Sequence, residues 1–181
     1  YKEKILKKTF FMSRVVWLTG LSGSGKTTIA KKLQKKLKIK NFKIKRVDGD
    51  SFRKKTKNFK NFSKKNIIQN NNLIIDYIKI ILKNYDYLIV SVISPLRQTR
   101  QRAKNIFGKN YFEVLVQCGI RELIKRDTKG LYKLATEKKI DNLIGYKSKI
   151  SYENSKYRVI SVNTKKLNLS ASVDKIIKNI T

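Results

Sequence analysis

Residues 17–30, WLTGLSGSGKTTIA, decide the fold that the rest of the chain has to follow. Within this stretch, Gly20 to Thr27 match the spacing G-x-x-x-x-G-K-[ST], between an apolar run that suits a strand and a pattern that suits an amphipathic helix. Glycines let a loop turn consecutive N–H groups onto phosphate oxygens, and the N-terminus of the following helix adds a favourable field. The stretch therefore predicts a phosphate-binding loop for ATP or GTP.

The loop residues have separate expected roles. Lys26 is expected to reach the β- and γ-phosphates, and the Thr27 hydroxyl to ligate Mg²⁺. A glycine-rich turn without chemistry is the alternative, and the match of both motif and context disfavours it. The predicted nucleotide-binding set is Gly20, Leu21, Ser22, Gly23, Ser24, Gly25, Lys26, Thr27 and Thr28.

Outside the loop, short apolar runs rich in Val, Ile and Tyr alternate with longer stretches of helical period. Expected strands are 14–19, 43–47, 87–93, 111–117 and 157–162, and expected helices are 26–38, 66–83, 96–106, 120–127 and 170–180. We therefore expect an α/β fold: a three-layer sandwich of the P-loop NTPase type with a mainly parallel five-stranded sheet. Residues 128–156 are interpreted as a lid segment. One kinase domain is expected over 12–181, with 1–11 as an N-terminal extension or fragment end.

Composition limits the other classes. The chain has 181 residues, 40% of them hydrophobic, which argues against global disorder. No apolar run is long enough to span a membrane, so no membrane partner is expected. The single cysteine, Cys118, and the absence of histidine exclude an internal disulfide and a Cys/His zinc site, which points to a reducing cytoplasm. The net charge of +32 comes from lysine spread along a chain also rich in Asn and Ile, a composition typical of an AT-rich genome. Nucleic acid is therefore not expected as a partner.

A second motif follows the expected second strand. Asp48-Gly49-Asp50 and then Arg53 lie where strand ends line the ligand crevice of a parallel α/β sheet. Asp50 could orient or deprotonate an attacking hydroxyl and contact magnesium-bound water, while Arg53 could pair with an anionic acceptor. The competing interpretation is a solvated turn that caps a helix.

Four segments occur together in one order: WLTGLSGSGKTTIA at 17–30, DGDSFR at 48–53, ISPLRQTR at 93–100 and RDTKGLYKLA at 126–135. This combination resembles the adenylylsulfate kinase family. The resemblance implies a P-loop kinase that uses ATP and Mg²⁺ to phosphorylate the ribose 3′-hydroxyl of adenylylsulfate, a small-molecule nucleotide acceptor. Related kinases are often dimers, so a homodimer stays open.

The resemblance also implies roles for individual positions. Catalytic roles fall on Lys26, Asp50 and Ser94, metal binding on Thr27 and Asp50, and contact with the ATP base on Arg126. In-line transfer needs no covalent step, so Ser94 is expected to hydrogen-bond rather than carry phosphate. Arg97 and Arg100 could meet phosphates or belong to an ordinary basic helix face. The expected acceptor-binding set is Asp48, Asp50, Arg53, Phe62, Asn70, Ser94, Pro95, Arg97, Lys129, Gly130 and Leu131.

Two positions depart from the family pattern. Ile67 stands where an acceptor-binding arginine is expected, and Leu143 stands where a second base-stacking aromatic is expected. Two alternatives therefore remain. One is the same reaction on another nucleotide, such as a cytidine diphosphoramidate. The other is a non-catalytic nucleotide- or nucleic-acid-binding module, which the intact Lys26, Thr27 and Asp50 disfavour.

Overall fold

The computed structural model describes residues 12–55 and 63–181, so the expected extension 1–11 and the expected base-stacking Phe62 lie outside the described residues. The described residues form one five-stranded sheet of order β2-β3-β1-β4-β5 in which every pairing is parallel. The strands are β1 (Arg14–Thr19), β2 (Ile44–Asp48), β3 (Tyr87–Ser91), β4 (Tyr111–Gln117) and β5 (Ile160–Asn163). The expected α/β fold class is confirmed.

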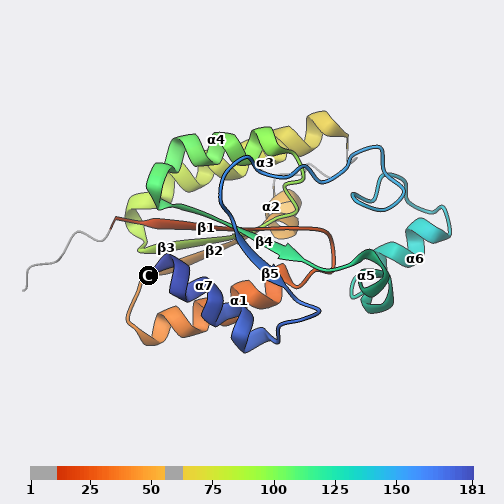
Figure 1. The fold of residues 1–181 in the computed structure, drawn as a ribbon. Coiled ribbons are helices and arrows are strands. Elements are labelled where there is room, and N and C mark those ends of the chain that lie inside the picture. Colours follow the sequence, from red (N-terminus) through yellow and green to blue (C-terminus); the bar gives the residue numbers. More distant parts are fainter. Residues whose placement is uncertain (1–11, 56–62) are drawn as a thin grey trace, which may run out of the picture.

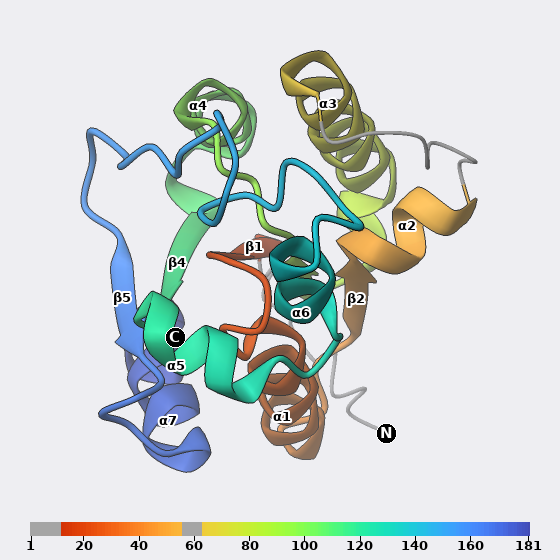
Figure 2. The same ribbon diagram turned by 90° about the vertical axis from the view of Figure 1, so that its right-hand side faces the viewer.

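Helices cover both faces of this sheet (Figure 1). One face carries α1 (Lys26–Ile39) and α7 (Leu169–Ile180), and the other carries α3 (Lys64–Ile81) and α4 (Arg97–Phe107). Three short helices, α2 (Gly49–Lys55), α5 (Ile120–Arg126) and α6 (Leu131–Thr136), lie at the carboxyl end of the sheet (Figure 2). Single 3₁₀ turns, Leu82–Asn84 and Gly108–Asn110, precede β3 and β4.

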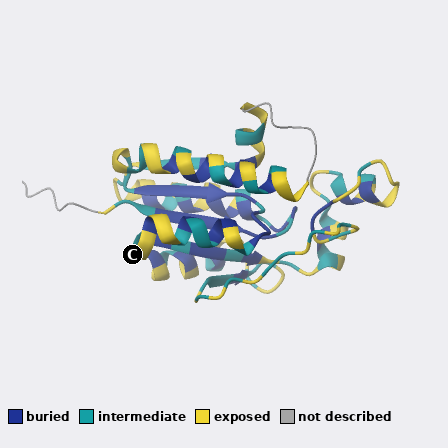
Figure 3. Ribbon diagram, turned by 90° about the horizontal axis from the view of Figure 1, so that it is seen from above, coloured by how far each residue is buried: buried dark blue, intermediate teal, exposed yellow. Residues whose placement is uncertain are grey.

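The core has two layers because successive side chains of a strand point to opposite faces. In β1, Val16 and Leu18 pack toward α1 and α7, whereas Val15 and Trp17 pack toward α3 and α4. All four side chains are fully buried. Figure 3 shows the same arrangement, with a buried sheet between helices whose outer faces are exposed. A strand that is buried on both faces has a continuous apolar run in its sequence, and for this reason β1 could be predicted from the sequence.

Several boundaries differ from expectation. The third strand ends at Ser91 instead of 93, and the fifth pairs only from Ile160 instead of 157. Tyr157 instead turns its hydroxyl to Glu113, a bond outside the strand ladder. Helix α2, which begins at Gly49 within the DGD motif, was not among the expected helices. The expected lid segment contains α6, and residues 137–159, all of them described, form neither helix nor strand.

A buried ion pair links α4 to β4. Arg100 Nε lies 3.1 Å from Glu113 Oε1, and the two side chains are 0% and 2% exposed. On the same helix, Arg102 pairs with Asp76 of α3, but those side chains are 39% and 51% exposed. Removing one partner of a buried pair leaves a charge without compensation, whereas an exposed charge is solvated by water.

We therefore predict that Arg100→Met lowers the free energy of unfolding by roughly 3–5 kcal/mol. Arg102→Met, the matched control two residues further along the same helix, should lower it by less than about 1 kcal/mol. Urea denaturation of both variants measures the difference. Equal losses would show that Arg100 contributes no more to stability than a surface cation.

Candidate active site

The phosphate-binding loop needs glycine at defined positions. Gly20 has φ +138° and Gly25 has φ +97°, both in the left-handed region that other residues rarely adopt. A Cβ on Gly20 would also lie 2.3 Å from the carbonyl oxygen of Val116. The loop thus lies directly against β4, and helix α1 begins at Lys26, immediately after it.

Lys26 folds back over its own loop. Its Nζ donates hydrogen bonds to the carbonyl oxygens of Gly20 (2.9 Å) and Leu21 (2.6 Å). Burial, with a smaller contribution from nearby Lys129, lowers the pKa of Lys26 from 10.5 to about 7. Burial thus disfavours the charged form of this amine, and the oxygens of a bound phosphate would favour it.

Asp48 connects the loop to the ends of β2 and β3. Its Oδ2 accepts from the Thr27 and Ser91 hydroxyls at 3.0 Å each, and its Oδ1 accepts from the backbone N–H groups of Asp50 and Ser51 at 3.2 Å each. Partial burial acts to raise the pKa of Asp48, but these hydrogen bonds outweigh it and hold the pKa below its usual value. An ionised carboxylate therefore lies beside the Thr27 hydroxyl.

Those two oxygens suit a hard divalent cation such as Mg²⁺. The sequence assigned metal binding to Thr27 and Asp50. In the structure the carboxylate bonded to Thr27 is that of Asp48, and Asp50 points toward another group. Asp48 is thus an additional candidate for the metal, directly or through water.

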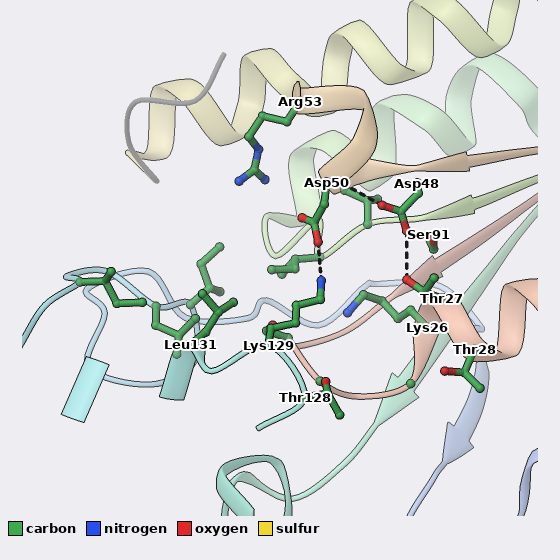
Figure 4. Close-up of a pocket in the computed structure, with 18 of the residues that line it drawn as sticks. Lys26, Thr27, Thr28, Asp48, Asp50, Arg53, Ser91, Thr128, Lys129 and Leu131 are labelled. Atoms are coloured by element: carbon green, nitrogen blue, oxygen red, sulfur yellow. Dashed lines mark hydrogen bonds and ion pairs between the residues drawn. The ribbon is translucent and has the colours of Figure 1, made fainter. Parts of the chain in front are cut away.

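Asp50 and Arg53 approach the same cavity from α2 (Figure 4). Asp50 lies in the first turn of α2, 53% exposed, and forms an ion pair with Lys129, which precedes α6. Figure 4 shows Lys26 and Thr27 on the phosphate-loop side and the Asp50–Lys129 pair across from them. The two expected halves of the site therefore face each other.

The far end of the cavity is apolar. Leu131, Ile140, Leu143 and Ile144 line it from the segment that follows α5, and Val92 and Ile93 line it from the end of β3. Leu143, where an aromatic was expected, is 5% exposed and packs in one cluster with Leu123 and Tyr132. This end can hold a flat apolar group such as a nucleobase by aliphatic contact.

Two residues of α3 lie away from the cavity. Ile67 is 6% exposed and packs with Leu96 and Ile144 in a small core cluster, so an arginine at that position would have to be buried. Asn70, expected to contact the acceptor, is 4% exposed and is absent from the described lining of the cavity. Neither side chain reaches the cavity in this conformation.

Ser94, Pro95 and Arg97 also lie beside the cavity rather than on it. The Ser94 hydroxyl is 1% exposed and lies 3.2 Å from the Thr99 hydroxyl, in keeping with an expected hydrogen-bonding role. The Pro95 carbonyl accepts from the backbone N–H of Glu153, and the Arg97 N–H donates to the Glu153 carboxylate. The Arg100 side chain is fully buried, so it does not belong to an exposed basic helix face, and Arg100 is absent from the described lining of the cavity.

Arg126 lies at the other end of the phosphate loop. It pairs with Glu122 and donates to the hydroxyl and carbonyl oxygens of Thr164, and the Thr164 hydroxyl donates to the Ser24 carbonyl. Gly130, at φ +65°, forms the turn that places Lys129 and Leu131 on the cavity.

Sequence reasoning missed Ser91, Thr128 and Thr164. Ser91 had a usable signal, because in the parallel register of β2 and β3 it stands opposite Asp48. Thr128 and Thr164 carry no motif that points to a ligand, and only the fold brings them to the site.

The fold and this site define the class of protein. A glycine-rich loop with Lys26 and Thr27, facing Asp50 at the carboxyl end of a parallel sheet, is the arrangement of a P-loop kinase. Comparison with known proteins gives the family. The family model for adenylylsulphate kinase matches residues 12–163. The chain belongs to the adenylylsulfate kinase family.

Individual relatives agree over nearly the whole chain. An adenylyl-sulfate kinase of Bacteroides thetaiotaomicron is 34% identical over 180 residues, which cover 99% of this chain and 87% of the relative. A probable adenylyl-sulfate kinase of Pyrococcus abyssi is 36% identical over 163 residues, covering 90% and 92%. The structure of the Mycobacterium tuberculosis APS kinase CysC in complex with AMPPNP and APS has a TM-score of 0.80 at 26% identity, covering 92% of this chain and 96% of that one.

None of the helices in the described residues is both long enough and apolar enough to cross a membrane.

The lowered pKa of Lys26 predicts that ATP binding is coupled to a proton. Above pH 7 the free protein holds Lys26 largely neutral, and bound phosphates favour the charged form, so binding at pH 8 should take up close to one proton per ATP. Affinity should fall as the pH rises above 7. Calorimetry in two buffers of different ionisation enthalpy measures this uptake. In Lys26→Arg, whose guanidinium does not titrate, the uptake should disappear; a wild-type chain that binds ATP at pH 8 without proton uptake contradicts the assignment.

Proposed function

We propose that this chain is a Mg²⁺-dependent kinase that transfers the γ-phosphoryl group of ATP to the ribose 3′-hydroxyl of adenylylsulfate, giving ADP and 3′-phosphoadenylylsulfate. One observation carries the proposal: a phosphate loop and an acceptor-side carboxylate face each other across a single cavity, in a chain of the adenylylsulfate kinase family.

On the donor side, backbone N–H groups of the loop and the N-terminus of α1 bind the phosphates. When phosphate oxygens approach, the Lys26 ammonium can exchange the Gly20 and Leu21 carbonyls for the β- and γ-phosphates. Arg126, fixed by Glu122 and Thr164, is in place to lie along the adenine of ATP.

Thr27 and Asp48 would hold Mg²⁺, which would supply positive charge to offset the negative charge that develops on the phosphates during transfer. Ser91 keeps the Asp48 carboxylate oriented by donating to the same oxygen as Thr27.

On the acceptor side, Asp50 is placed to orient the attacking hydroxyl and accept its proton. Lys129, paired with Asp50 in the structure, would stabilise the transferred phosphoryl group. Arg53, on the same helix, supplies a positive charge for the anionic end of the acceptor. Catalysis then rests mostly on positioning and charge stabilisation.

The apolar end of the cavity is the part of the site on which acceptor choice depends. Leu143 offers an aliphatic surface in place of an aromatic face, which weakens stacking on the acceptor base by about 1–3 kcal/mol. A cytidine diphosphoramidate acceptor therefore remains the competing assignment, and the test includes it.

We predict a kcat/KM for adenylylsulfate of about 10⁴ M⁻¹s⁻¹ or higher with Mg-ATP. The assay measures ADP and the phosphorylated product in parallel reactions with adenylylsulfate, CDP, a cytidine diphosphoramidate and no acceptor. Turnover only with the cytidine compound would assign the other acceptor. ADP release that is equally fast without any acceptor would contradict the kinase assignment.

The same assay tests the role of Asp50. Asp50→Asn removes the group that accepts the proton, so kcat should fall about a hundredfold. Asp76→Asn removes an exposed carboxylate that pairs with Arg102 on the outer helices, and activity should stay within about twofold. An Asp50→Asn enzyme as fast as its control would exclude Asp50 from the mechanism.

A further inference from the structure

The segment 152–157, which follows the lid and which we call the return segment, is fastened to the protein by one buried cation. Arg100 Nε lies 3.1 Å from Glu113 Oε1 and 3.2 Å from the Ser155 hydroxyl. Its Nη1 donates to the Ser94 carbonyl at 2.5 Å, and its Nη2 donates to the Glu153 carbonyl. Arg100 therefore holds the return segment against both β4 and the chain that leaves β3.

Tyr152 extends this attachment to the phosphate loop. The guanidinium carbon of Arg100 lies 4.7 Å from the centre of the Tyr152 ring, which fixes the ring by a cation–π contact. The Tyr152 hydroxyl lies 3.0 Å from Thr19 Oγ1. The Thr19 hydroxyl has one proton, and it donates that proton to the Ile93 carbonyl at 2.5 Å. Tyr152 is therefore the donor to Thr19.

Burial keeps Tyr152 in the form that can donate. It raises the pKa of Tyr152 to about 12, with a smaller opposing effect from Arg100, so the hydroxyl keeps its proton at neutral pH. The hydroxyl therefore has the proton that it needs to donate to Thr19.

The hydrogen bond from Tyr152 to Thr19 lies at the start of the phosphate loop. Thr19 directly precedes Gly20, the first residue of the phosphate loop, and the Gly20 N–H also points to the Ile93 carbonyl at 3.4 Å. Ile93 also lines the cavity into which Asp50 and Lys129 project. The phosphate loop and the cavity wall at Ile93 thus meet at one junction of three residues, Thr19, Ile93 and Tyr152.

We propose that Tyr152, oriented by Arg100, is a positioning residue that fixes the separation between the phosphate loop and the Ile93 wall, and with it the in-line geometry of phosphoryl transfer. Tyr152 itself touches neither the loop lysine nor the described cavity. The inference rests on the proposed kinase function, because it concerns the alignment of two substrates.

Tyr157 provides a matched control. Its hydroxyl donates to Glu113 Oε2 at 2.5 Å, so it belongs to the same buried group as Arg100. Within the part of the chain that the structure describes, it forms no hydrogen bond to the phosphate loop or to Ile93. Replacing either tyrosine with phenylalanine removes one hydroxyl and keeps the ring. Only the change at Tyr152 breaks the junction.

Steady-state kinetics with Mg-ATP and adenylylsulfate distinguish a residue that aligns the two substrates from one that only stabilises the fold. In Tyr152→Phe, kcat should fall about tenfold or more, because misplaced reactants lose rate even when both still bind. KM for each substrate should stay within about threefold. Tyr157→Phe should keep the wild-type kcat even if its melting temperature falls. An unchanged kcat in Tyr152→Phe, or equal losses in both variants, would overturn the inference.

A second mutation checks that the effect passes through Thr19. Thr19→Val removes the acceptor of the Tyr152 bond, so adding Tyr152→Phe to it should reduce kcat little further. Full additivity of the two losses would show that the residues act separately and would contradict the proposal.

Hydrogen exchange gives a readout that does not depend on the acceptor. In Tyr152→Phe, peptides covering residues 18–25 and 91–96 should exchange faster than in wild type, whereas peptides from α7 should not change. If wild type fails to phosphorylate adenylylsulfate, the proposed function fails while this comparison still tests the junction. Unchanged exchange in both peptides would overturn the inference by itself.

Discussion

The parallel pairing of β1 with both β3 and β4 is the constraint on which the site depends. Because all five strands run in the same direction, their carboxyl ends meet at one edge, and several polar groups of the site lie at or just after the end of a strand there. The phosphate loop follows β1, Asp48 ends β2, and Ser91 ends β3. The parallel pairing of the strands thus brings residues that are far apart in sequence to one edge of the sheet, where they form the site.

The two halves of the site are built by different means. The donor half is local: one loop of eight residues supplies N–H groups, Lys26 and Thr27, and burial of Lys26 prepares a charge for an incoming anion. The acceptor half is assembled from α2, from the end of β3 and from residues 128–144. An ion pair across the cavity joins Asp50 to Lys129. Changes of acceptor can therefore arise in the second half without disturbing the first.

This difference explains what could be predicted from sequence. The loop, its strand and its helix were predictable because their signals lie within fourteen consecutive residues, and the DGD motif could be placed because β2 ends there. Ile67 could not be interpreted correctly, because only the packing against Leu96 and Ile144 shows that the position is buried. Arg100 resembles a surface cation in sequence, and its partner Glu113 is thirteen residues away on another element. Long-range packing, which no local pattern encodes, decides such positions.

The central claim is that this site transfers the γ-phosphoryl group of ATP to the ribose 3′-hydroxyl of adenylylsulfate. The most direct test is a single-turnover reaction of the protein with Mg-ATP and adenylylsulfate, with the product analysed by ³¹P NMR. The account predicts one new phosphomonoester on the ribose 3′-oxygen of adenylylsulfate and one ADP for each product molecule. ADP accompanied by inorganic phosphate, with adenylylsulfate recovered unchanged, would contradict it.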